Sequence, residues 1–173
     1  MNPVFIPRSH ETSTIIAMAG VTASEMRREF ICTEHLLLAM TEDHQTCSEI
    51  TDLFSLDIGQ IRKFIFDKVP VGEPQAPCAP RLSPRSKNVL ALALKIAKNV
   101  FGFDHVLPIH LFLGILEDGN GWAALAMKDC GLTYPIALSK IPMQGDLSRP
   151  GPFPKHLVRR KPDDRPKSSV IIK

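Results

Sequence analysis

Apolar residues recur at steps of three and four through most of the chain, which is the spacing of helices that bury one face. The clearest run lies between Ser83 and Gly102, where the apolar stripe widens to nearly the whole circumference of a helix. Ser83 and Pro84 are typical of a helix start and Gly102 of a helix end, and we expect so apolar a helix at the centre of a bundle. No stretch alternates with a period of two for long enough to predict a strand. The predicted class is therefore all-α.

The same spacing predicts seven further helices. They cover about residues 9–26, 34–43, 46–54, 58–69, 109–118, 121–130 and 134–141. Two proline-rich stretches interrupt the pattern, at residues 70–82 and 142–173, and proline does not continue a helix. We expect the first to be a connector inside a domain spanning residues 9–141, and the second to be a basic, flexible tail.

The chain contains an internal repeat. A shift of 75 residues places residues 33–43 on residues 108–118, with five of the eleven positions identical. The same shift carries apolar positions of the first helix, among them Ile15 and Met26, onto Leu90 and Phe101. We therefore predict two four-helix repeats, at about 9–69 and 83–141, joined by the connector at 70–82. A unit of about 60 residues is marginal alone, so the two repeats are expected to share one core with pseudo-twofold symmetry.

The charge of the chain is uneven. The net charge is +3, but residues 1–149 hold 14 Lys and Arg against 16 Asp and Glu, whereas residues 150–173 hold seven against two. The basic excess thus belongs to the tail and does not assign the folded body to nucleic acid. No apolar run approaches the roughly 20 residues of a membrane span, and the first residues do not resemble a signal peptide. We expect a cytoplasmic protein that does not bind membranes.

The four cysteines give no sign of a metal site or of a disulfide. They are far apart, form no C-x-x-C pair and have no histidine at ligand spacing, and their positions are Cys32, Cys47, Cys78 and Cys130. We interpret them as small buried residues or free thiols.

Two stretches carry a family resemblance. Thr33-Glu34-His35-Leu36-Leu37-Leu38 opens the second helix, and Ser83-Pro84-Arg85-Ser86-Lys87-Asn88-Val89-Leu90 opens the second repeat. Together with the repeated four-helix unit, they resemble the N-terminal repeat domain of the Clp unfoldase ATPases, the Clp N or Clp R domain. The resemblance covers about residues 9–141 and implies an eight-helix module that recognises substrates and adaptors.

The chain lacks the motor that follows this domain in full-length Clp ATPases. No G-x-x-x-x-G-K-[ST] string is present to hold the phosphates of ATP, and no other catalytic motif is found. We therefore expect a non-enzymatic protein without a cofactor. The resemblance implies partners among the components of Clp-type unfoldases and proteases, or among their protein substrates.

Glu34 has the most specific predicted role. In the resembling family, the glutamate of this signature lines a pocket for arginine-like and phosphoarginine groups, because a carboxylate can accept both N–H donors of a guanidinium. The alternative is structural: Thr33 would be the N-cap, and an acid at the first helical position is stabilised by the helix dipole. In the second repeat the matching residue is Ile109, so at most one such pocket is expected.

Other candidates have competing interpretations. Arg27 and Arg28 could attract a phosphate beside Glu34, or they could be solvated residues that complement the end of the first helix. His35 and His110 recur at the same place in both repeats, and we expect each to make a hydrogen bond that fixes the second helix against its neighbours. Trp122 is either a core residue or a partner anchor.

Two classes of function follow. The first is a module of the Clp proteolysis system that acts as adaptor, receptor or accessory factor. The second is a structural or regulatory helical protein that binds something unrelated. Nucleic acid would then bind basic residues of the tail, namely Lys155, Arg159, Arg160, Lys161, Arg165 and Lys167. The tail lacks Trp and Tyr for base stacking and contains two aspartates, so we do not expect nucleic acid.

Overall fold

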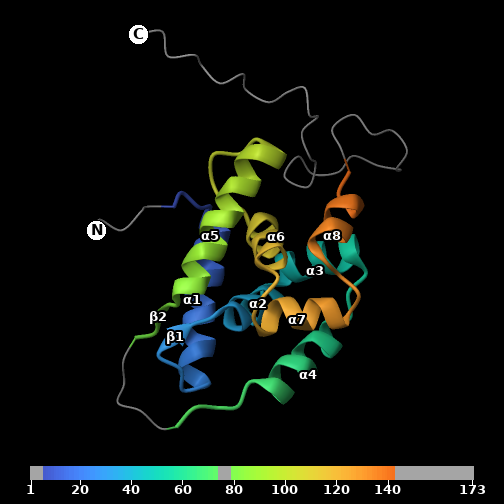
Figure 1. The fold of residues 1–173 in the computed structure, drawn as a ribbon. Helices are drawn as coiled ribbons and strands as arrows, with labels where there is room; N and C mark the ends of the chain where they lie inside the picture. Colours follow the sequence, from blue (N-terminus) through green and yellow to red (C-terminus); the bar gives the residue numbers. More distant parts are fainter. Residues whose placement is uncertain (1–5, 74–78, 143–173) are drawn as a thin grey trace, which may run out of the picture.

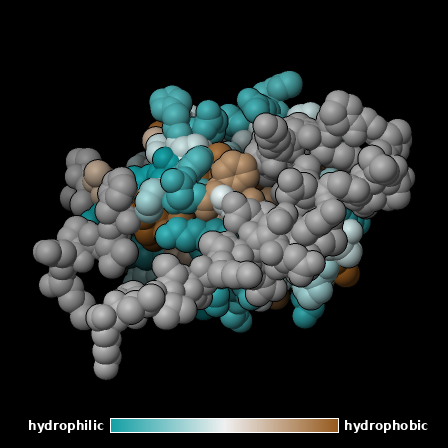
Figure 2. All heavy atoms as spheres, turned by 90° about the horizontal axis from the view of Figure 1, so that it is seen from above, coloured by the Kyte–Doolittle hydropathy of each residue, from teal (hydrophilic) through white to brown (hydrophobic). Residues whose placement is uncertain are grey.

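The computed structural model describes residues 6–73 and 79–142 and confirms the all-α class (Figure 1). Within these residues the eight α-helices are α1 His10–Glu25, α2 Thr33–Glu42, α3 His44–Phe54, α4 Ile58–Lys68, α5 Pro84–Ile96, α6 Pro108–Asp118, α7 Trp122–Asp129 and α8 Tyr134–Lys140. A π-helical turn, η1 Ala97–Phe101, extends α5, and two two-residue strands, β1 Phe30–Ile31 and β2 Arg81–Leu82, stand between helices. No described helix combines the length and the apolar character that a membrane crossing requires. Seen from above, the described surface is mostly hydrophilic, with apolar residues showing between the hydrophilic ones (Figure 2).

The helix starts follow from capping side chains. Four helices begin at a side chain that accepts a backbone N–H of the first turn; these residues are Ser9, Asp43, Asp57 and Ser83. The Ser83-Pro84 start and the Gly102 end expected for the longest apolar run are both present, with Gly102 at a φ of 79°. Local sequence therefore sets the boundaries of these helices.

The centre of the core differs from our expectation. Nine of the ten residues of α2 and eight of the eleven residues of α6 are buried. In α5, which the sequence analysis placed at the centre, only five of thirteen are buried. That placement was wrong, because Leu92 and Leu94 are only partly buried and the polar face of α5 meets solvent. The core is thus built around the second helix of each repeat.

The short segments that precede the helices pair across the two repeats. Strand β1, which leads into α2, pairs in parallel with β2, which leads into α5. In the same way Val106, which precedes α6, pairs with Arg8, which precedes α1. Two buried hydroxyls reinforce these crossings: Ser86 donates to the carbonyl of Ile31 at 2.7 Å, and Thr12 donates to that of Val106 at 2.9 Å.

The outer helices cross over as well. Helix α4 packs on α7 and α3 packs on α8, so each contact joins one repeat to the other. At these contacts Gln60 donates to the Asp129 carboxylate at 3.1 Å, and the Lys140 ammonium donates to the Phe54 carbonyl at 2.8 Å. The halves therefore form one pseudo-twofold unit.

The repeat has two registers, not one. The N-caps Ser9 and Ser83 are 74 residues apart, and the buried positions of α1, such as Ile15 and Ala19, match Val89 and Ala93 at that same distance. The assignment of Ile15 to Leu90 by a uniform shift of 75 was therefore wrong.

The π-helical turn accounts for the change of register. After it, the matching pairs lie 75 apart, for example Met26 with Phe101 and His35 with His110. A π turn closes its hydrogen bonds over one more residue than an α turn, so η1 takes up a single inserted residue. One consequence bears on function: the residue of the first repeat that corresponds to Arg85 is Glu11.

Candidate functional site

The signature at the start of α2 surrounds a histidine cap. Cys32 is the N-cap and Thr33 is the first helical residue, so the expectation that Thr33 caps the helix was wrong. The backbone N–H of Cys32 donates to Nδ1 of His35 at 2.9 Å. In the second repeat the N–H of Leu107 donates to Nδ1 of His110 at 3.2 Å. Each histidine thus caps the start of its own helix. Within the described residues, Nε2 of His35 does not form the hydrogen bond to a neighbouring helix that we expected.

Glu34 lies one residue further into the helix than expected and is only 9% exposed. Thr33 Oγ1 donates to its Oε2 at 3.5 Å, and burial raises the pKa of the Glu34 carboxyl. The positive charges of Arg28 and Arg85 lie close enough to oppose that rise in pKa. The carboxyl is therefore largely removed from solvent and lies within reach of the charges of two arginines.

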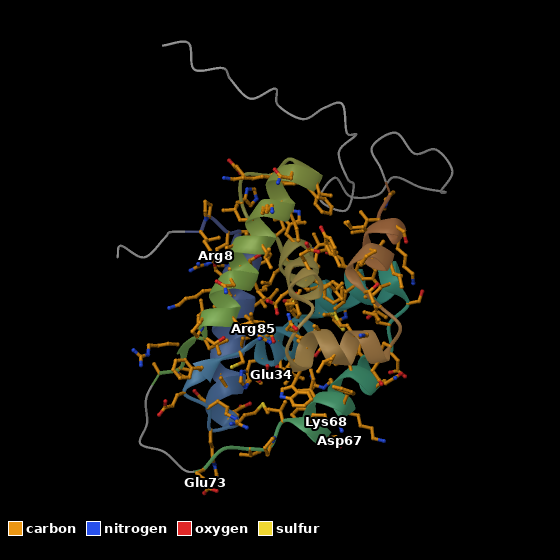
Figure 3. The ribbon with its side chains drawn as sticks, in the orientation of Figure 1. Arg8, Glu34, Asp67, Lys68, Glu73 and Arg85 are labelled. Carbon is orange, nitrogen blue, oxygen red and sulfur yellow. The ribbon has the colours of Figure 1, made fainter. Side chains whose placement is uncertain are left out.

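Arg85 completes the site from the other repeat (Figure 3). Its Nε lies 3.9 Å from Oδ2 of Asp118, at the end of α6. Gly121, at a φ of 86°, follows at the start of α7, where a Cβ would lie 2.9 Å from Thr33 Oγ1 and 3.2 Å from the Arg85 guanidinium. Only glycine fits there. The sequence analysis did not single out Arg85, Asp118 or Gly121 as site residues, although Arg85 stands in the signature that opens the second repeat.

The two predicted arginines have different positions. Arg27 is exposed, lies beyond the end of α1 and has a left-handed φ of 56°. The guanidinium of Arg28 donates to the carbonyl of Pro70 and so ties the end of α1 to the residues after α4. Arg28 also acts on the pKa of both Glu34 and His35. Of the two, the structure therefore brings Arg28 to the site.

Potential metal ligands do meet at this helix start. Donor atoms of Cys32, Glu34 and His35 all lie within 4.8 Å of one another, so the statement that no histidine stands at ligand spacing from a cysteine was wrong. Burial and Arg28 lower the pKa of His35 to about 4, so its ring is neutral at physiological pH. Because Nδ1 already accepts the Cys32 N–H, Nε2 carries the proton, and neither nitrogen has a lone pair for a metal. This set of ligands does not suit a metal ion.

The corresponding place in the second repeat is open. A cavity of about 440 Å³ lies at the starts of α1, α3 and α6, and Ile109 forms part of its wall. Ile109 itself is buried, and it occupies the position on α6 that Glu34 occupies on α2. Acidic residues of the first repeat line the cavity instead.

Three further predictions concern Trp122, the cysteines and the tail. Trp122 is 39% exposed at the start of α7, so it is not a core residue. Cys32, Cys47 and Cys130 are free thiols. Cys78 and the basic residues of the tail lie outside the described residues.

The chain is similar to known Clp proteins. A model of the Clp repeat (R) N-terminal domain matches residues 8–101. The chain is 24% identical over 128 residues to the chaperone protein ClpB of Oceanobacillus iheyensis, and equally to the negative regulator of genetic competence ClpC/MecB of Bacillus subtilis. Each match covers 73% of this chain and 16% of the relative, so the chain spans about a sixth of the length of these relatives.

Solved structures share the fold. The N-terminal domain of the chaperone ClpD from Arabidopsis thaliana superposes with a TM-score of 0.58 at 20% identity, over 80% of this chain and 97% of that domain. A structure described as a preliminary investigation of a malarial protein secretion system gives a TM-score of 0.67 at 16% identity, over 76% and 90% of the two chains.

Proposed function

Because the chain belongs to the Clp repeat (R) N-terminal domain family, we propose that it acts as an adaptor, receptor or accessory factor that presents proteins to a Clp-type unfoldase. The fold and the family support a Clp-related protein-interaction module. The finer role rests on one observation, which is the buried carboxyl of Glu34 within reach of the charges of Arg28 and Arg85.

That carboxyl is not needed to build the helix. Helix α6 begins with the same histidine cap and the same chain path, yet has Ile109 where α2 has Glu34. Burying a carboxyl costs free energy, as the raised pKa of Glu34 shows. A residue that costs stability and is dispensable for the fold is typical of a binding site.

The surroundings of Glu34 suit a ligand that carries both a positive and a negative group. A carboxylate accepts the N–H donors of a guanidinium, while Arg28 and Arg85 offer positive charge to a phosphate. A phosphoarginine side chain combines these two groups. We propose that Thr33, Glu34 and Arg28, together with Arg85, form its binding site, and that Arg27 contributes at most from the exposed rim.

A degradation assay tests the role. The chain is added to a reconstituted Clp unfoldase and protease that degrades an arginine-phosphorylated protein. We expect the degradation rate to change at least twofold, rising if the chain delivers the substrate and falling if it sequesters it. Glu34→Ala should remove the effect, whereas Glu25→Ala, at an exposed position on α1, should keep it. An unchanged rate with the parent chain would contradict the proposal.

A further inference from the structure

The cavity at the start of α6 combines an apolar wall with an acidic rim. Its apolar wall is formed by Phe103, Leu107, Pro108 and Ile109. Phe103 is held in place by its contact with the buried ring of His110, at 5.5 Å between centroids, and its backbone N–H bonds to Ala97 at the start of η1. The wall is therefore part of the fixed core. A volume of about 440 Å³ is within the usual range of ligand sites.

The rim carries carboxylates from α1 and α3. Glu11, Asp43 and Glu49 line the cavity together with His10, and among the described residues no lysine or arginine does so. The pKa of Glu11 is lowered by hydrogen bonds from its own backbone and from Ser9, so this carboxyl is ionised. Asp43 lies close enough for its charge to act on Glu11. The rim of the cavity is therefore acidic and attracts a cation.

The first repeat shows where that cation belongs. With the registers set by η1, Glu34 corresponds to Ile109, Asp118 to Asp43, and Arg85 to Glu11. At the Glu34 site Arg85 pairs with Asp118. The second site retains the partner aspartate but has a second acid where the arginine would stand. The second site therefore has an acid at the position where the first site has a base.

We propose that this cavity binds a peptide segment of a partner protein in which a lysine or arginine stands beside an apolar residue. The cation takes the place that Arg85 has in the first repeat, and the apolar neighbour packs on Ile109 and Phe103. A phosphorylated or acidic segment is excluded, because its charge faces Glu11, Asp43 and Glu49. The two repeats then bind ligands of different charge, and this inference does not depend on the function proposed for Glu34.

Fluorescence anisotropy with a labelled nonapeptide containing one Arg-Leu pair tests the inference directly. Glu11→Gln should weaken binding about tenfold, the usual loss for one charge-assisted contact. Glu11→Arg places a positive charge of the protein itself in the cavity, which repels the basic peptide, and should abolish binding. Glu25→Arg makes the same change in charge on the exposed end of α1 and should bind like the parent. Thr14→Trp, on the rim of the cavity, should block binding by bulk and leave the charges intact.

Each alternative has its own outcome. The inference is overturned if the peptide does not bind, if a Glu-Leu peptide binds equally well, or if Glu25→Arg loses binding as fully as Glu11→Arg. A peptide of residues 155–167 that binds when the Arg-Leu peptide does not would identify the chain's own basic segment as occupant. Affinity that falls as the protein concentration rises would identify a second copy. Circular dichroism excludes misfolded variants, and Glu34→Ala should bind this peptide normally, which separates the two sites.

Discussion

The starts of α2 and α6 have the same backbone and the same histidine cap but opposite chemistry. In the first, a buried carboxyl lies within reach of the charges of Arg28 and Arg85. In the second, Ile109 faces a space lined by Glu11, Asp43 and Glu49. The difference teaches that the fold requires the cap and the apolar core, whereas the charges around each helix start are free to vary. Four predictions test that comparison.

The largest effect concerns the shared cap. His110→Ala should lower the free energy of unfolding by about 3 kcal/mol, because it removes a buried hydrogen bond and the ring packed on Phe101 at 4.7 Å between centroids. His35→Ala removes a similar hydrogen bond, and within the described residues no aromatic ring packs on His35, so this change should cost about 1 kcal/mol less. Urea denaturation measures both. Equal losses would show that the aromatic packing adds nothing.

Binding of phosphoarginine should occur at one site only. Glu34→Ala should weaken it ten- to a hundredfold, about the value of a bidentate charge-assisted contact. The double variant Glu11→Arg, Ile109→Glu copies the first site into the second and should add a second, weaker site. Calorimetric titration gives the stoichiometry. Two sites in the parent chain, or unchanged affinity in Glu34→Ala, would show that Glu34 serves only its helix.

Acid should destabilise the protein through His35. Burial lowers its folded pKa from 6.5 to about 4, so between these pH values the unfolded chain binds a proton that the folded chain does not. Stability is therefore fully present above about pH 6.5 and is lost as the pH falls toward 4, by about 1 kcal/mol per pH unit. The raised pKa of Glu34 acts in the opposite sense, so the cleanest measurement compares Glu34→Gln with Glu34→Gln, His35→Gln. Identical slopes of stability against pH would contradict the assignment.

The smallest effect is a gain. Glu34→Gln should raise the free energy of unfolding at pH 7 by about 0.5–1 kcal/mol, because it removes a buried charge and keeps the shape. Thermal denaturation at pH 7 measures this gain, with Glu25→Gln as the control at an exposed position. A loss of stability would favour a structural role for Glu34.

The repeat in the sequence predicted much of this fold. Helical spacing and capping residues such as Ser83 and Gly102 are local signals, so the eight helices and their approximate ends could be read directly. The position of α5 in the bundle could not be predicted, because an apolar face does not reveal how many other helices pack on it. The uniform shift of 75 also concealed the inserted residue in η1, since apolar positions in α5 match at both registers.

The site was predicted in part. The signature identified Glu34, but its burial and its two arginines depend on elements far apart in sequence. Arg85 and Asp118 reach the first site from the second repeat, and Glu11 and Asp43 reach the second from the first. Only the correct register makes Arg85 and Glu11 equivalent. Gly121 was missed because the close approach that requires glycine exists only in the folded chain.

The segments that precede the helices pair across the repeats, and this crossed pairing explains why two copies are needed. Residues 30–31 pair with 81–82, and Val106 pairs with Arg8, so a single repeat alone would keep both of its edges unpaired. Two identical copies would satisfy each other's edges through one twofold axis, as in an isologous homodimer. The tandem chain has the pairing pattern of such a dimer, with residues 70–82 between the two copies. Two copies in one chain need not be identical, as the copies of a homodimer must be, so Glu11 and Arg85 can carry opposite charges at matching positions.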